Sequence, residues 1–162
     1  MKHNVRDIKI FNMYIESCNV HAEHMSYAQS VFRSVIPLNA KTLEDLSSDQ
    51  VAYLDQLIYR FTKLQDTIGR KIFPIMLGLM GEDTTDSSFI DKLNKLEKIG
   101  ALKTKQFWQD LRETRNLISH EYPEEEELLL EAINTCIVDA DRLLEYWNDL
   151  KKFIDKRVMQ SL

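Results

Sequence analysis

The chain has 162 residues, of which 44% are hydrophobic and 29% charged, so we expect one ordinary globular domain over residues 1–162. Its 21 basic and 26 acidic side chains give a net charge of −5, which argues against a surface that binds nucleic acid broadly through phosphates. No apolar run approaches the ~20 residues of a membrane span, and the N-terminus leads into no long apolar stretch. We therefore expect a cytoplasmic protein without membrane contact.

The spacing of apolar residues predicts an all-α fold, since glycine and proline are too scarce for the turns of a many-stranded sheet. In chain order, the expected helices cover residues 5–35, 47–81, 88–99, 104–120 and 123–155. Thr42 and Ser47 are start signals, and Pro74 should kink the second helix. Gly81 and Gly100 suit the left-handed conformation that often ends a helix. We expect an antiparallel bundle of four to five helices.

The fourth expected helix divides into an apolar stripe and a polar face. The stripe that should face the core holds Phe107, Leu111, Thr114 and Ile118. The opposite face holds Gln109, Arg112, Glu113, Asn116 and His120, with Arg115 on the flank beside Ser119. Arg115 and His120 stand about 140° apart on an unbroken helix. They can converge if the helix ends near His120, because Pro123 disfavours helical geometry at Tyr122, or if a second chain contributes.

From residue 112 the sequence reads Arg-Glu-Thr-Arg-Asn-Leu-Ile-Ser-His-Glu-Tyr-Pro. An arginine, four residues, a histidine, one residue and a tyrosine form the signature of HepT-like HEPN proteins. It stands here as Arg115, His120 and Tyr122. Asn116 after the arginine and Pro123 after the tyrosine also match what is common in that family. The chain therefore resembles the HEPN-domain family, more loosely over residues 54–154, and closest to the HepT-like ribonuclease toxins.

The resemblance implies a metal-independent endoribonuclease that needs no cofactor, forms a homodimer and cleaves an RNA such as tRNA or mRNA. It implies the toxin of a type VII-like toxin–antitoxin system, with an MntA-like nucleotidyltransferase as antitoxin. Carried over, Arg115 and His120 would be catalytic, and Tyr122 would receive AMP, which silences the toxin. Three neighbours would support the site: Arg112, Asn116 and Ser119.

The residue types suit this chemistry. Histidine titrates near neutral pH, so His120 could move the proton of a ribose 2′-OH. The planar guanidinium of Arg115 could meet two oxygens of the negatively charged transition state. Both roles need these side chains to lie beside the same phosphate.

Two other interpretations stay open on sequence alone. The chain could be a non-catalytic helical binding subunit of a nucleotidyltransferase, which its negative charge and the glutamate run at residues 124–127 favour. It could also be a structural bundle with a chance motif, in which Arg115 forms a surface salt bridge with Glu113 or Glu121.

Other candidate groups favour structural roles. His21 and His24 have ligand-like spacing but no obvious third ligand, so we predict no metal site. Cys18 and Cys136 lie at apolar helical positions, where small buried thiols are expected. Four aromatic residues could form either a dimer face or core: Tyr53, Tyr59, Phe107 and Trp108.

Overall fold

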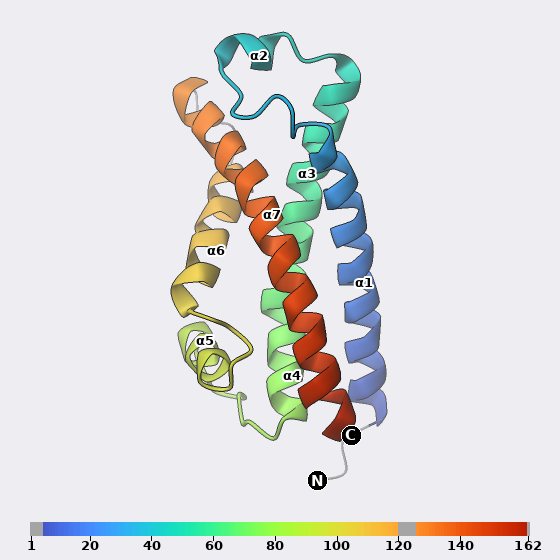
Figure 1. The fold of residues 1–162 in the computed structure, drawn as a ribbon. Helices are drawn as coiled ribbons and strands as arrows, with labels where there is room; N and C mark the ends of the chain where they lie inside the picture. Colours follow the sequence, from blue (N-terminus) through green and yellow to red (C-terminus); the bar gives the residue numbers. More distant parts are fainter. Residues whose placement is uncertain (1–4, 120–125, 162) are drawn as a thin grey trace.

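The computed structural model describes residues 5–119 and 126–161 (Figure 1). These residues form helices α1 (Val5–Ser30), α2 (Ala40–Glu44), α3 (Ser48–Thr67), the π-helical η1 (Ile68–Ile72), α4 (Phe73–Leu79), α5 (Phe89–Lys98), α6 (Lys105–Ser119), α7 (Glu126–Arg157) and the 3-10 helix η2 (Met159–Ser161). No strand occurs in these two ranges. The predicted all-α bundle is confirmed. Figure 1 shows α1, the α3–α4 run, α6 and α7 alternating in direction along one long axis.

The α3–η1–α4 run corresponds to the second predicted helix, and Pro74 lies in its last part. Proline has no N–H to donate, and its ring crowds the carbonyl four residues earlier in an α-helix. The chain resolves this conflict with the π-helical turn Ile68–Ile72, where the N–H of Phe73 donates to the carbonyl of Ile68. The predicted kink is therefore a widened turn, and the helical run continues to Leu79.

Helix ends follow the predicted signals except in the first helix, which was predicted over residues 5–35 but ends at Ser30 and continues in turns. The side chains of Ser47 and Ser88 cap α3 and α5 by accepting from backbone N–H groups in the first turn. Gly81 and Gly100 adopt φ of +83° and +79° directly after α4 and α5, as predicted. One short helix was missed: α2, which is capped by reciprocal hydrogen bonds between Asn39 and Thr42. Thr42, which was predicted as a start signal, lies at N3 of α2. It therefore helps to cap this short helix and does not begin α3.

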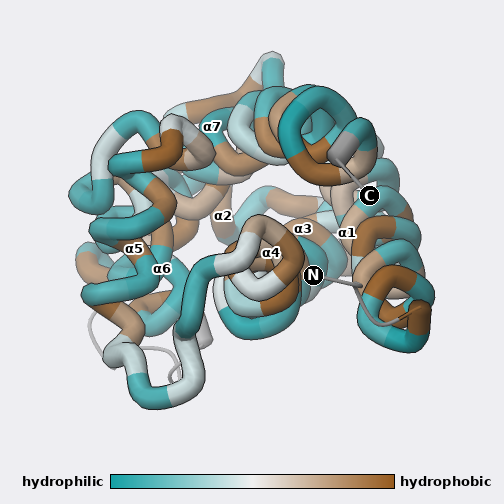
Figure 2. The backbone as a smooth tube through the Cα atoms, turned by 90° about the horizontal axis from the view of Figure 1, so that it is seen from below, coloured by the Kyte–Doolittle hydropathy of each residue, from teal (hydrophilic) through white to brown (hydrophobic). Residues whose placement is uncertain are grey.

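α3 lies at the centre of the packing and contacts α1, α6 and α7. Figure 2 looks along the bundle, where the α3–α4 run lies between α1 on one side and the α5–α6 pair on the other. The predicted thiol burial is confirmed, since Cys18 and Cys136 are both fully buried and free. Burial raises the pKa of Cys18 to about 12 and also raises the pKa of Cys136. Both thiols therefore act as apolar filling.

Two contacts fix α6 against its neighbours. The fully buried ring of Trp108 packs on Gly69 of η1, where an added Cβ would meet the ring Cζ2 at 3.2 Å. On the side facing α7, the buried hydroxyl of Thr114 donates to Asp139 Oδ2 at 2.7 Å. Arg142 Nη1 donates to the other carboxylate oxygen at 2.7 Å, so both oxygens of this buried group are paired.

We predict that Thr114→Val lowers the free energy of unfolding by about 1–3 kcal/mol, because the variant leaves a buried Asp139 oxygen without its donor. Urea denaturation of the two proteins measures the difference. Glu113→Gln, at the exposed neighbouring position, is the matched control and should change stability by less than about 0.5 kcal/mol. Equal stability of Thr114→Val and wild type would show that this hydrogen bond does not hold α6.

Candidate functional site

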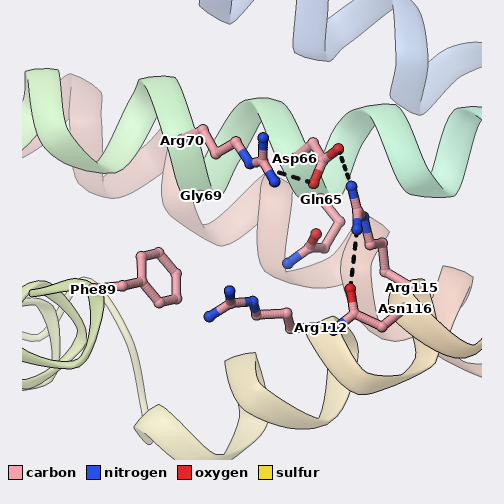
Figure 3. Close-up of a pocket in the computed structure, with 8 residues that line it drawn as sticks. All are labelled: Gln65, Asp66, Gly69, Arg70, Phe89, Arg112, Arg115 and Asn116. Atoms are coloured by element: carbon pink, nitrogen blue, oxygen red, sulfur yellow. Dashed lines mark hydrogen bonds and ion pairs between the residues drawn. The ribbon is translucent and has the colours of Figure 1, made fainter.

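Three of the predicted site residues line one cleft. Arg112, Arg115 and Asn116 of α6 border a cavity of about 180 Å³ between this helix and the α3–η1 run. The other lining residues are Gln65, Asp66, Gly69, Arg70 and Phe89 (Figure 3). His120, Tyr122 and the side chain of Ser119 lie outside the described residues. The apolar stripe and polar face of α6 are confirmed, since Leu111, Thr114 and Ile118 are buried while Arg112 and Asn116 are exposed.

Arg115 is held in a defined position within this cleft. Its Nη2 donates to Asp66 Oδ2 at 2.7 Å, and its Nη1 donates to Asn116 Oδ1 at 3.0 Å. The buried Nε has no hydrogen-bond partner among the described residues. Asp66 lies 49 residues earlier on α3, so Arg115 pairs with a distant acidic side chain and not with Glu113, one of the two local partners allowed by the chance-motif interpretation. The other, Glu121, lies outside the described residues. The polar face of α6 turns Arg115 toward α3, where an acidic side chain meets it.

The cleft is a local basic patch in an acidic protein. Asp66 also lies 3.9 Å from Arg70 Nε, so one carboxylate is shared by two arginines. With Arg112, the lining holds three arginines against one aspartate, a net of two positive charges. The whole chain carries −5. This is the kind of patch that the composition required of any contact with a phosphate.

Two further lining residues add a polar and an aromatic group. Gln65 is only 3% exposed, and Figure 3 shows its side-chain amide pointing from α3 toward α6. Among the described residues, nothing forms a hydrogen bond with this amide. The ring of Phe89, the first residue of α5, lies under the guanidinium of Arg112 at 4.8 Å. This contact holds Arg112 over the cleft.

The residues contributed by α3 and η1 were not predicted. Phe61, Gln65, Ile68 and Ile72 follow each other at intervals of four, three and four residues. Gln65 therefore occupies a core position in an otherwise apolar stripe. A polar residue in such a position was the signal available in the sequence. Asp66 and Arg70 carry no comparable signal, since an exposed pair four residues apart is common on helices.

The histidine pair on α1 faces α3. His21 Nδ1 lies 3.0 Å from Arg60 Nη1, and His24 Nδ1 lies 3.5 Å from Gln56 Nε2. Burial and the nearby Arg60 charge lower the pKa of His21. Within the described ranges, no group of three or more His, Cys, Asp or Glu side chains could hold a metal ion. The positively charged guanidinium of Arg60 beside His21 would repel a metal ion, so we interpret the two histidines as packing contacts between α1 and α3.

The four aromatic residues that could form core or a dimer face differ in burial. Trp108 is fully buried, whereas Phe107 and Tyr53 are half-buried and Tyr59 is 52% exposed. Phe107 also lines a second, larger cleft of about 450 Å³ with Arg142, Tyr146 and Phe153. That cleft lies at the opposite end of α6 from Arg115, so it is separate from the basic cleft.

Comparison with known proteins gives no match to a protein-family model, a curated protein or a solved structure. In the described part of the chain, no helix is both long and apolar enough to cross a membrane.

We predict that Asp66→Asn costs less than about 1 kcal/mol of unfolding free energy, because the Asp66–Arg115 pair is only partly buried. Urea denaturation beside wild type and Thr114→Val measures this difference. The pair would then serve chiefly to place Arg115. A loss of about 3–5 kcal/mol, as when a buried ion pair loses one partner, would instead make the pair a structural element of the core.

Proposed function

We propose that this chain is a metal-independent endoribonuclease of the HEPN type, the toxin of a HepT-like toxin–antitoxin system. The observation that carries the proposal is the placement of Arg115. The arginine marked by the sequence motif lies in a cleft with a net of two positive charges, fixed by Asp66 and beside Asn116. If the motif were a chance match, we would expect Arg115 on a solvated helix face, and not in a concave site that two further arginines also line.

The proposed reaction is an internal transfer of a phosphodiester. The 2′-oxygen of one ribose attacks the adjacent phosphorus, and the bond from phosphorus to the 5′-oxygen of the next nucleotide breaks. The products are a 2′,3′-cyclic phosphate and a 5′-hydroxyl. One group must accept the proton of the 2′-OH and one must protonate the leaving oxygen. No metal ion or cofactor is needed to balance this step.

Arg115 is assigned to the negative charge that grows on the phosphorus oxygens. Its guanidinium donates from Nη2 to Asp66 and from Nη1 to Asn116, so its orientation is set before RNA binds. Preorganised donors of this kind stabilise a transition state without reorganisation during the reaction. Asn116 supports the same phosphate from the same helix, and Arg112 and Ser119 are assigned supporting roles beside it from their places around the motif.

His120 is assigned to the proton transfers. In the sequence His120 directly follows Ser119, the last residue of α6, and Arg115 lies on the same helix. An imidazole has a pKa near neutrality, which suits both acceptance and donation of a proton. The proposed homodimer would let a second chain contribute to the same cleft. Leu117, next to Asn116, and Leu128 of α7 are 45% and 46% exposed, and such apolar groups are suited to a contact between chains.

The proposed regulator is a nucleotidyltransferase antitoxin. It would transfer AMP from ATP to the Tyr122 hydroxyl, with pyrophosphate as the leaving group. The modification adds a phosphodiester and an adenosine two residues after His120. The added phosphate would compete with RNA for the arginines of the cleft, and the bulk of the adenosine would obstruct the substrate.

We predict that unmodified wild-type protein cleaves single-stranded RNA in the presence of a chelator. His120→Ala should lower the rate about 10²–10⁴-fold, because it removes the proton-transfer group. Arg115→Gln should lower it about 10²–10³-fold, because it removes a donor to the transition state. Rates of cleavage of a labelled RNA measure both effects, after intact mass has shown that no AMP is attached.

The matched control is His24→Ala, which removes an exposed histidine on α1, and it should cleave as wild type does. Cleavage by His120→Ala at the wild-type rate would refute the assignment. If unmodified wild-type protein does not cleave RNA at all, the alternative is favoured, namely a non-catalytic helical binding subunit of a nucleotidyltransferase. The exposed Glu126 and Glu127 at the described start of α7 would then be candidates for its contact with a basic partner.

We also predict that incubation with the partner nucleotidyltransferase and ATP adds one AMP to the wild-type chain and abolishes its RNA cleavage. Tyr122→Phe should gain no mass, because it lacks the accepting hydroxyl. Tyr59→Phe, a change at an exposed tyrosine of α3, should be modified like wild type. Intact mass spectrometry measures all three, and AMP on Tyr122→Phe would place the modified residue elsewhere.

A further inference from the structure

The basic cleft holds more binding groups than the proposed cleavage uses. We propose that Gln65, Arg70 and Arg112 form a subsite for one nucleotide of single-stranded RNA next to the scissile phosphate. The two arginines bind its phosphate and Gln65 reads its ribose 2′-OH. This inference rests on the proposed ribonuclease function and names the substrate feature by which the same cleft distinguishes RNA from DNA.

Gln65 provides the first argument. Gln65 as a residue is only 3% exposed, and its amide forms no hydrogen bond with the described residues, so what remains accessible of it faces the cleft. An amide that is held in place by its buried stem and has no partner within the protein is available to hydrogen-bond a ligand in the cleft. Figure 3 shows the amide pointing into the space between α3 and α6.

The chemistry of an amide narrows the ligand. A glutamine side chain both donates and accepts hydrogen bonds, whereas a phosphodiester only accepts them. The amide oxygen of Gln65 needs a donor, which a phosphodiester does not have. A ribose 2′-OH lies beside the phosphate of the backbone and supplies that donor. Deoxyribose lacks it, so Gln65 can distinguish RNA from DNA.

Arg70 and Arg112 provide the second argument. Arg70 is 71% exposed on its side chain, and its contact with Asp66 is a 3.9 Å ion pair, so it can turn to a phosphate at little cost. Arg112 is held by the ring of Phe89 and has no acidic partner among the described residues. Both line the cleft from opposite helices, and a phosphate between them would be bound from two sides.

The size of the cleft favours one unit of a chain over a free small molecule. Its volume of about 180 Å³ is below the ~300–1,000 Å³ of pockets that enclose a whole small ligand. One phosphate and one ribose can enter while the chain continues outside. In a regular duplex, both strands would have to approach together, so the narrow cleft favours a single strand.

Binding of a short single-stranded oligonucleotide, made as RNA and as DNA, tests the subsite. His120→Ala protein is used as the background so that the RNA stays intact, and affinity is measured over a range of salt concentrations. Arg70→Gln and Arg112→Gln should each reduce the slope of log K against log salt by about 0.7, for RNA and for DNA, because each removes one phosphate contact. Arg33→Gln, at an exposed arginine after α1, should leave the slope unchanged.

Gln65→Leu in the same background should weaken RNA binding on the order of 10-fold, the effect of one lost hydrogen bond, without altering the salt slope. Its affinity for DNA should stay at the background value, which also shows that the variant is folded.

Unchanged slopes in both arginine variants, or equal weakening for RNA and DNA in Gln65→Leu, would overturn the subsite. Cleavage of RNA by wild type alongside those results would leave the ribonuclease function standing. Wild-type protein that binds with the expected slopes but never cleaves would refute the function and keep the subsite.

Discussion

The close packing of Trp108 on Gly69 sets the geometry on which the basic cleft depends. The indole is fully buried and packs also on Phe73 and Tyr146, with ring centroids 4.7 and 5.7 Å away. Glycine at position 69 makes this close approach of α6 to η1 easy, because a Cβ there would meet the ring at 3.2 Å and would push it away by a few tenths of an ångström. Gly69 is also part of the cleft lining. The contact that anchors one part of α6 therefore brings Arg115, two turns further along, within reach of Asp66.

The charge of the protein gives this cleft its importance. A chain of net charge −5 gains little from general attraction to a nucleic acid. The cleft lining, with three arginines and one aspartate, is a local exception, and Asp66 offsets the repulsion between two of the arginines, Arg70 and Arg115. Under the proposed function, this local charge is what would bring RNA to the cleft and not to the rest of the surface. Glu126 and Glu127, exposed at the described start of α7, add to the negative charge outside the cleft lining.

Much of the fold could be predicted from local patterns. Helix caps at Ser88 and Gly100 depend on neighbours within four residues, so the sequence contains the whole interaction. The polar face of α6, with Arg112 and Asn116 on it and Arg115 on its flank, was predicted for the same reason, whereas the choice of these three as site residues came from the motif. The partner of Arg115 was not predictable, because Asp66 is brought to it by packing between α3 and α6, 49 residues apart in the sequence. The π-helical turn before Pro74 likewise reflects a compromise between proline geometry and a long helix that is held by its neighbours.

The chemical form of the RNA ends tests the central claim most directly. A 2′-oxygen attack assisted by His120 and Arg115 leaves a 2′,3′-cyclic phosphate on one fragment and a 5′-hydroxyl on the other. We predict these ends on RNA cut by unmodified wild-type protein in the presence of a chelator, as read by end-group labelling and mass spectrometry. Fragments that carry a 5′-phosphate and a 3′-hydroxyl would contradict the claim, because they require attack by water and a different set of catalytic groups.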